Sequence, residues 1–439
     1  MWGGYRAGWG VGNGLNMLTS LTVENWKSFE KATLYIDALT VLIGTNASGK
    51  SNLLEALVFL SRIASGAMLT SALQGDGRLP PVRGGTDWAV HKPGSKFAVG
   101  LTYRVDEALD YDYRIECLVG HHRCTVSAEH LGRITYDSDA SGNRISATGV
   151  TDRRFTAEGT ADPLPNMSVN LNSADPGVYR HFNSAFCALF QMASMPADSE
   201  IVGDCVKIVE CLTNIFILDP IPSHMRGFST LSDRLEPDAC NIAGVIAALP
   251  AEPRRDIERT LTDYAAKLPE RDITRVFSET VGKLETDAML YCEEQFSANG
   301  ESAIVDARGL SDGTLRFLGI LTALLTRPAG SLLVIEEVDN GLHPSRSQLL
   351  LEMLRQIGGR RGLDIVVTTH NSALLDAMST SMVPFITVAH RDTETGASCL
   401  TLLEDIVQLP KLLAQGLVGR LSSQGLIERA LKTHSDHAA

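Results

Sequence analysis

Residues 44–51, GTNASGKS, place two glycines, a lysine and a serine at the spacing G-x-x-x-x-G-K-[ST]. The glycines let backbone N–H groups fold around phosphate oxygens, Lys50 reaches the β- and γ-phosphates, and Ser51 offers a hydroxyl to Mg²⁺. The segment therefore predicts a nucleoside triphosphate site with Mg²⁺, and the alternative is an ordinary glycine-rich turn. Further predicted nucleotide contacts are Asn46, Gly49 and Asn52.

Two adjacent glutamates follow the apolar run LLVI, residues 332–335. A phosphate loop needs an acid on a neighbouring strand for the metal, and a hydrolase also needs a group that orients water. We therefore predict that Glu336 holds the Mg²⁺ shell and that Glu337 polarises the attacking water. With His343 close behind, a carboxylate pair for acid–base chemistry or a metal site is an alternative, as is a surface acidic pair at a strand end.

Two further polar segments have weaker signals. In LSDGTLR, residues 310–316, Ser311 and the amide of Gly313 precede an apolar helix and could receive an anion. In VVTTHN, residues 366–371, His370 ends a strand, where an imidazole could bond a γ-phosphate. The alternatives are a turn or helix cap for the first segment and a satisfied polar side chain for the second.

Strands and helices alternate around these motifs. Strands 21–29, 31–37 and 39–43 lead into the glycine loop and a helix, and β-prone runs over 96–146 predict antiparallel strands. Helical apolar spacing dominates 186–275. Later strands separated by helices predict right-handed crossovers and a largely parallel sheet. These strands are 331–335, 363–369, 384–389 and 398–403, with a helix at 345–358 between the first two.

In this order, the four motifs resemble the nucleotide-binding domain of ABC-type ATPases of the SMC, RecF and OLD branch. Residues 21–57 are similar to that branch's N-terminal head sequence, and LSDGTLR to its signature motif. LLVIEEVDNGLHPSR resembles its Walker B motif and D-loop, and TTHN its switch histidine. The resemblance implies an α/β fold, with a P-loop NTPase head of the ABC type, a mixed sheet, an antiparallel β subdomain and a helical insertion.

The resemblance also implies how the site residues divide between two protomers. One half-site would contain Lys50, Ser51, Glu336, Glu337 and His370. Ser311 and Gly313 would serve the nucleotide of the second protomer, and Asp339 and His343 would make D-loop contacts in the dimer. Two heads would then enclose two ATP molecules head to tail, so that ATP favours the closed homodimer or a higher oligomer and hydrolysis opens it.

The resemblance covers both ends of the chain well and its middle poorly. We expect a glycine-rich leader at 1–16, the first half of the head at 17–185, a helical insertion at 186–275 and the second half at 276–439. A long coiled coil is missing from the sequence, and the short segment after His370 leaves no room for the Toprim nuclease of OLD proteins. The resemblance therefore implies a compact ATPase of bacterial anti-phage defence that controls a separate effector, such as a nuclease or toxin.

Composition limits the alternatives. The 439 residues carry a formal charge of −13, which disfavours nucleic-acid binding over the whole surface and leaves only a local DNA or RNA contact. Eight scattered cysteines predict reduced thiols in a cytoplasmic protein, and no apolar stretch is long enough to predict a membrane span. A RecF-like DNA-repair ATPase and an ATP-bound scaffold without hydrolysis remain alternatives. Arginines that could contact phosphates, or form a solvated face, are Arg254, Arg255, Arg355, Arg360 and Arg361.

Overall fold

The computed structural model describes residues 17–77, 79–120, 122–138, 144–145, 149–159, 166–171, 179–196, 199–268, 273–295 and 301–435. The chain forms two compact units. Unit 1 comprises Met1–Ile215, Gly330–Leu332 and Thr387–Leu402, and unit 2 comprises Phe216–Ala329, Leu333–Ile386 and Leu403–Ala439. The predicted leader, 1–16, lies outside the described residues.

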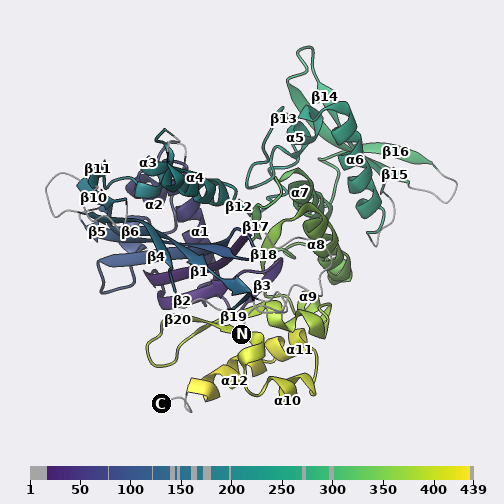
Figure 1. Ribbon diagram of the computed structural model, residues 1–439. Coiled ribbons are helices and arrows are strands. Elements are labelled where there is room, and N and C mark those ends of the chain that lie inside the picture. Colours follow the sequence, from purple (N-terminus) through teal and green to yellow (C-terminus); the bar gives the residue numbers. More distant parts are fainter. Residues whose placement is uncertain are drawn as a thin grey trace. The chain divides into compact units, whose positions relative to one another are not determined.

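An eight-stranded antiparallel sheet dominates unit 1, in the order β11-β10-β9-β6-β5-β4-β1-β2 (Figure 1). The antiparallel strands predicted within 96–146 are confirmed by the long pairings of β4, β5 and β6. The strands are β1 (Met17–Trp26), β2 (Phe29–Tyr35), β4 (Lys96–Arg104), β5 (Leu109–Gly120), β6 (Arg123–Thr135), β9 (Asp152–Gly159), β10 (Asn166–Asn170) and β11 (Tyr179–Asn183). A separate two-stranded pair contains β7 (Asp137–Ser138) and β8 (Arg144–Ile145).

Three buried aromatic rings join this sheet to the helix that follows the glycine loop of residues 44–51. Trp26 of β1, Phe59 of α1 (Lys50–Ala64) and Phe97 of β4 are each at most 1% exposed. Their ring centroids lie 4.9 to 5.9 Å apart with tilted or edge-on geometry, which aromatic pairs favour. The contacts fix α1 against the sheet and so fix the loop that precedes it.

The rest of unit 1 consists of short helices and three further strands. The helices are η2 (Thr86–Trp88), α2 (Leu69–Gln74), α3 (Ala188–Ala193) and α4 (Glu200–Thr213), and the strands are β3 (Leu39–Ile43), β19 (Ile386–Arg391) and β20 (Ser398–Leu402). Every residue of β3 is buried, as its largely apolar sequence favours. β19 and β20 pair antiparallel, so strands late in the chain are not all parallel.

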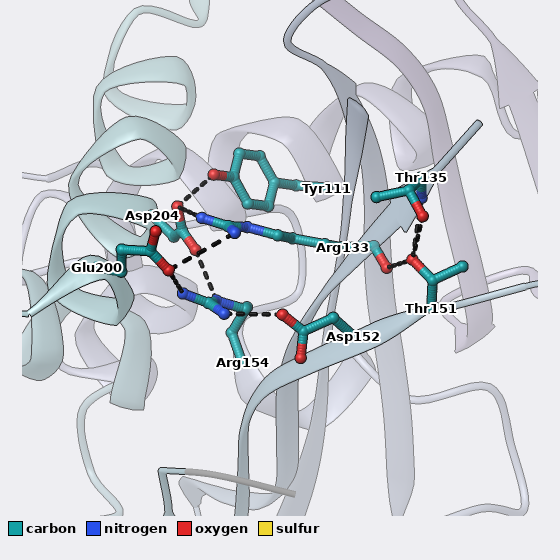
Figure 2. A network of polar contacts seen from close by, with 8 residues as sticks. All are labelled: Tyr111, Arg133, Thr135, Thr151, Asp152, Arg154, Glu200 and Asp204. Carbon is teal, nitrogen blue, oxygen red and sulfur yellow. Dashed lines mark hydrogen bonds and ion pairs between the residues drawn. The ribbon is translucent and has the colours of Figure 1, made fainter. Parts of the chain in front are cut away.

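A network of charged groups attaches α4 to the large sheet (Figure 2). Asp204 of α4 is 2% exposed and accepts hydrogen bonds from the hydroxyl of Tyr111 and from Arg133 (2.8 Å). Arg154 donates to Asp204 (2.7 Å) and to Glu200 (2.9 Å). Figure 2 shows the two guanidinium groups meeting at the Asp204 carboxylate. Two arginines from different strands therefore share one buried carboxylate, and Arg154 also pairs with Asp152 and Glu200.

A second buried carboxylate caps a short helix. Glu129 of β6 accepts hydrogen bonds from the backbone N–H groups of Ala188 (2.6 Å) and Leu189 (2.8 Å) at the start of α3, and from the hydroxyl of Tyr113 (3.0 Å). Burial raises the pKa of Glu129 to about 7, and the three donors only partly offset this effect. The charge of this side chain therefore changes near neutral pH.

Unit 2 contains the second group of predicted motif strands. β12 (Phe216–Leu218) pairs in parallel with β17 (Leu332–Ile335), which is followed in the order by β18 (Asp364–Thr368). α7 (Asp312–Thr326) is buried along most of its length, and α8 (Ser347–Arg361) leads into β18. Parallel and antiparallel pairs together give the mixed α/β architecture that the sequence predicts.

A small antiparallel sheet with two helices forms another part of unit 2, in the order β13-β15-β14, with β16 also paired to β15. Its elements are β13 (Ser229–Thr230), α5 (Ile242–Ala248), α6 (Ala251–Ala265), β14 (Ile273–Val281), β15 (Asp287–Gln295) and β16 (Ser302–Asp306). Side chains of α6 accept from the backbone of β14: Thr262 from Val276 N–H (3.0 Å) and Glu258 from Ser278 N–H (3.1 Å).

The predicted helical insertion, 186–275, does contain α3, α4, α5 and α6, but the boundary between the units divides it at Ile215 and Phe216. It also contains β12, whose apolar sequence FIL continues directly from the helical pattern of α4. Periodicity does not separate a short buried strand from a helix end, which explains the difference.

The remaining helices of unit 2 are η3 (Pro344–Arg346), α9 (Ser372–Asp376), η4 (Thr380–Phe385), η5 (Leu403–Asp405), α10 (Leu409–Leu413), α11 (Val418–Ser423) and α12 (Leu426–Ser435). α11 packs closely on α9, since a Cβ atom at Gly419 would lie 1.9 Å from the carbonyl oxygen of Ser372. In the part of the chain that the structure describes, no helix has the length and apolar character needed to cross a membrane.

We expect Asp204→Ala to lower the free energy of unfolding by about 3 kcal/mol or more, because it leaves two poorly exposed guanidinium groups without their shared carboxylate. Glu200→Ala is the matched control. The Glu200 side chain is 76% exposed, so its loss should cost no more than about 1 kcal/mol. Urea unfolding of both variants measures the difference, and equal effects would show that Asp204 is not the centre of the network.

We also expect Glu129 to lower the free energy of unfolding as pH rises. Its pKa is about 7 in the folded protein and near 4.5 when unfolded, so the folded state binds the proton more tightly and stability falls between these values. The fall over this window is about 3 kcal/mol. Unfolding free energies of the wild type and Glu129→Gln across the window test this, since the variant has no proton to lose. A difference between the two proteins that does not change with pH would contradict the prediction.

Candidate functional site

The loop predicted to hold phosphates connects the buried strand β3 to helix α1, as the sequence indicates. Gly44 and Gly49 have φ angles of 144° and 110°. A Cβ atom at Gly44 would lie 2.2 Å from the carbonyl oxygen of Ala389, and one at Gly49 would lie 2.6 Å from Ser398 Oγ. Both positions therefore require glycine, for conformation and for space.

Lys50 lies across this loop at the first residue of α1. Its Nζ atom donates to the carbonyl oxygens of Gly44 (2.6 Å) and Thr45 (3.0 Å). α1 has 15 residues. Its N-cap residue is Gly49, which has no side chain to cap the backbone N–H groups of the first turn. Ser51 is half-buried on the first turn of α1, and Asn46 is exposed in the loop. A cationic group, a hydroxyl and a helix N-terminus thus gather at one end of α1, which fits the phosphates of a nucleotide bound with Mg²⁺.

Asn52 makes a different set of contacts. Its side-chain amide donates to Ser28 Oγ (2.8 Å), and its backbone carbonyl oxygen accepts from Trp26 Nε1 (2.6 Å). Ser28 Oγ also accepts from Ser398 Oγ (2.8 Å). In this structure Asn52 therefore attaches α1 to the β1–β2 turn.

Arg391, at the end of β19, is a loop contact that sequence reasoning missed. Its Nε atom donates to the carbonyl oxygen of Ala47 (3.0 Å), and its Nη1 atom donates to that of Gly396 (2.7 Å). Ala47 has a φ angle of 64°, which is uncommon for a residue other than glycine, asparagine or aspartate. Arg391 lies 344 positions away in sequence, so no local pattern predicts this contact.

The predicted acids follow β17 in unit 2. Glu336 is half-buried, and its N–H group donates to the carbonyl oxygen of Leu218 (3.2 Å). Glu337 is exposed and has a φ angle of 44°. Its N–H group donates to Thr368 Oγ1 (2.8 Å), at the end of β18. The turn after β17 therefore leaves Glu336 half-buried and Glu337 exposed.

The loop before α7 shows the capping alternative. Ser311 Oγ accepts from the N–H group of Thr314 (3.1 Å), so it caps α7. Gly313 is buried, and a Cβ atom there would lie 2.6 Å from Arg346 Nη1 and 2.9 Å from the carbonyl oxygen of Gly341. The loop, Arg346 and the segment after the glutamates therefore lie in contact. The same helix N-terminus remains an anion-favouring position.

The predicted dimer and switch residues also lie in unit 2. His343 is exposed, and its Nδ1 atom contacts Ser345 Oγ (2.8 Å), where it caps η3. Asp339 is 7% exposed. His370 is exposed, two residues after β18, and the following Asn371 caps α9 (2.9 Å).

Unit 1 thus brings together the predicted loop residues, and unit 2 contains the predicted acids, the signature loop, the D-loop residues and the switch histidine. Among the described residues no group of three or more histidines, cysteines or acids could hold a metal ion by itself. A P-loop Mg²⁺ does not need such a group, because nucleotide phosphates and water supply most of its ligands.

Comparison with known families and proteins fits this geometry. Residues 17–74 match the family described as an AAA ATPase domain, and residues 243–376 match the family described as an AAA domain, putative AbiEii toxin, Type IV TA system. The first segment contains the P-loop, and the second contains the signature loop, both glutamates and His370. The chain therefore carries ATPase-domain sequence around each of its motif groups.

Individual relatives match over shorter stretches. The chain is 43% identical over 74 residues to a DNA replication and repair protein RecF of Caulobacter sp. (strain K31), which is 17% of this chain and 19% of that protein. It is 30% identical over 120 residues to a methionine import ATP-binding protein MetN of Rhizobium meliloti (strain 1021), or 25% and 33%. The chain thus spans only about a fifth to a third of these relatives. Over these stretches the chain is therefore similar to RecF and to an ATP-binding protein.

Two solved structures are similar over most of the chain. An SMC head bound to the C-winged helix domain of ScpA aligns with a TM-score of 0.46 and 13% identity, over 88% of this chain and 97% of that one. The SMC head domain from Thermotoga maritima aligns with a TM-score of 0.39 and 13% identity, over 88% and 98%.

Proposed function

We propose that the chain binds and hydrolyses ATP with Mg²⁺, and that ATP joins two copies head to tail until hydrolysis separates them. The observation that carries the proposal is the P-loop: two glycines in conformations and spaces that no other residue fits, Lys50 across the loop, and a 15-residue helix with no N-cap side chain. The ATPase-domain matches over residues 17–74 and 243–376 support it.

Each site residue has a role in this proposal. Ser51 and Glu336 hold the Mg²⁺ ion, Glu337 orients the attacking water, and His370 contacts the γ-phosphate. Asn46, Gly49 and Lys50 bind the phosphates of the same nucleotide. Ser311 and Gly313 of one copy contact the nucleotide of the other, and Asp339 and His343 lie at the contact between copies. Because the bound phosphates then connect two chains, their hydrolysis removes the charge that holds them together.

We further propose that this switch regulates a separate effector, such as a nuclease or toxin, in bacterial defence against phage. The family description for residues 243–376, which includes a putative toxin of a Type IV TA system, is the support for this association. A cytoplasmic location follows from the same proposal.

A RecF-like role in DNA repair is the second candidate, and the 43% identity over 74 residues to RecF favours it. The two candidates differ in their need for a partner. A repair role requires ATP-dependent, salt-sensitive DNA retention by this chain alone, whereas a defence switch requires an effector.

We expect Lys50→Ala to weaken ATP binding about 10- to 100-fold, because it removes the charge-assisted contacts to the β- and γ-phosphates. Titration with a fluorescent ATP analogue, with and without EDTA, measures this. Lys207→Ala on an exposed position of α4 is the matched control and should bind as the wild type does. Equal affinity of Lys50→Ala and the wild type would exclude the P-loop as the nucleotide site.

We expect Glu337→Gln to lower turnover about 100-fold or more while it retains ATP binding, because the amide cannot accept a proton from the attacking water. The variant should then accumulate as a dimer with ATP and remain a monomer with ADP in size-exclusion chromatography. Glu252→Gln, at an exposed position of α6, is the control. Normal turnover in Glu337→Gln would remove the assignment of the water-orienting residue.

A further inference from the structure

The backbone of Glu337 is held in an unfavourable conformation by several contacts. A φ angle of 44° in a residue other than glycine costs about 1 to 2 kcal/mol. The N–H group of Glu337 donates to Thr368 Oγ1 (2.8 Å), and its carbonyl oxygen accepts from the N–H group of Asn340 (2.8 Å) and from Arg316 Nη2 (3.1 Å). The direction of its carboxylate therefore depends on these three partners.

Arg316 connects this turn to a second strand. Besides Glu337, its Nη2 atom donates to the carbonyl oxygen of Glu336 (2.9 Å) and to Asp219 Oδ1 (3.1 Å). Its Nη1 atom donates to the carbonyl oxygen of Pro220 (2.7 Å). Asp219 and Pro220 directly follow β12, the parallel neighbour of β17. One guanidinium group thus binds the ends of two adjacent strands.

Arg316 also lies close to the predicted signature loop. Arg316 is 5% exposed and is the fifth residue of α7, whose N-terminus is the loop of Ser311 and Gly313. Its Nε atom is buried without a hydrogen-bond partner among the described residues. An apolar side chain would avoid that cost, so packing alone does not account for an arginine here.

We propose that Arg316 is a positioning residue that couples the loop of Ser311 and Gly313 to the direction of the Glu337 carboxylate. The inference rests on the proposed function and adds its regulation. When the nucleotide of the second copy contacts the N-terminus of α7, a shift of that helix moves the guanidinium group and with it the carbonyl oxygens of both glutamates. A strained turn held by three partners has few alternative arrangements, so it follows such a shift instead of absorbing it.

The test compares turnover with nucleotide binding. We expect Arg316→Met to lower kcat about 10- to 100-fold, as a misplaced catalytic group does, and to change ATP affinity less than twofold. Arg316→Lys should recover part of kcat, because an ammonium group can reach one of the carbonyl oxygens. In the double variant Arg316→Met with Glu337→Gln, the ATP-dependent dimer should still form as in Glu337→Gln alone.

Arg226→Met is the matched control. Arg226 donates to the carbonyl oxygens of Ala307, Arg308 and Leu310 and to Asp312 (2.5 Å), so it holds the same loop without contacting either glutamate. Its loss should reduce ATP-dependent dimer formation and leave kcat per dimer within about twofold. Should Arg316→Met not fold, Thr368→Val replaces it, because it removes the acceptor of the Glu337 N–H group and should also lower kcat with unchanged ATP affinity.

Each outcome decides one point. Wild-type kcat in folded Arg316→Met, or in Thr368→Val where that variant replaces it, overturns the coupling. A loss explained wholly by weaker ATP binding also overturns it. Absence of turnover and of ATP-dependent dimers in the wild type would instead reject the proposed function itself.

Discussion

Close backbone approach at the end of β3 is the constraint on which the predicted phosphate loop depends. The carbonyl oxygen of Ala389 occupies the space where Gly44 would carry a Cβ atom, so the loop leaves β3 pressed against β19. This contact fixes the first residue of the loop. After the loop, the contacts of Trp26, Phe59 and Phe97 fix α1 against the sheet. The glycine-rich loop is therefore attached to rigid elements on both sides.

Buried charge has a comparable role in both units. In unit 1, Asp204 satisfies Arg133 and Arg154 and so joins α4 to the sheet. In unit 2, Arg316 donates to Asp219 and to the backbone carbonyl oxygens of Pro220 and both glutamates, and thereby orders the turn of the two glutamates. A buried ion with several charged or polar partners favours one arrangement, because other arrangements leave its charge without compensation.

The sequence was most informative where chemistry and local structure coincide. The glycine spacing of residues 44–51 and the largely apolar sequence of β3 predict a strand, a loop and a helix, and the structure has them in that order. Sequence reasoning did not find Arg391, because it acts from a strand 344 positions away. Thr368 was visible in VVTTHN, but only the folded backbone reveals its contact with the Glu337 N–H group. Arg316 was visible as the end of LSDGTLR, but only the folded backbone reveals which carbonyl oxygens it binds. Likewise β12, a three-residue strand, carries too little periodicity to separate it from the helix before it.

Helix α6 covers part of the edge of strand β14, and this limits how copies of the chain can associate. Thr262 and Glu258 accept hydrogen bonds from β14 N–H groups that would otherwise attract another strand. Exposed strand edges recruit further strands and lead to aggregation, and a polar helix laid along the edge prevents this. Along β14, therefore, a neighbouring molecule finds side chains and not an open backbone, so that association through this edge by strand pairing is blocked.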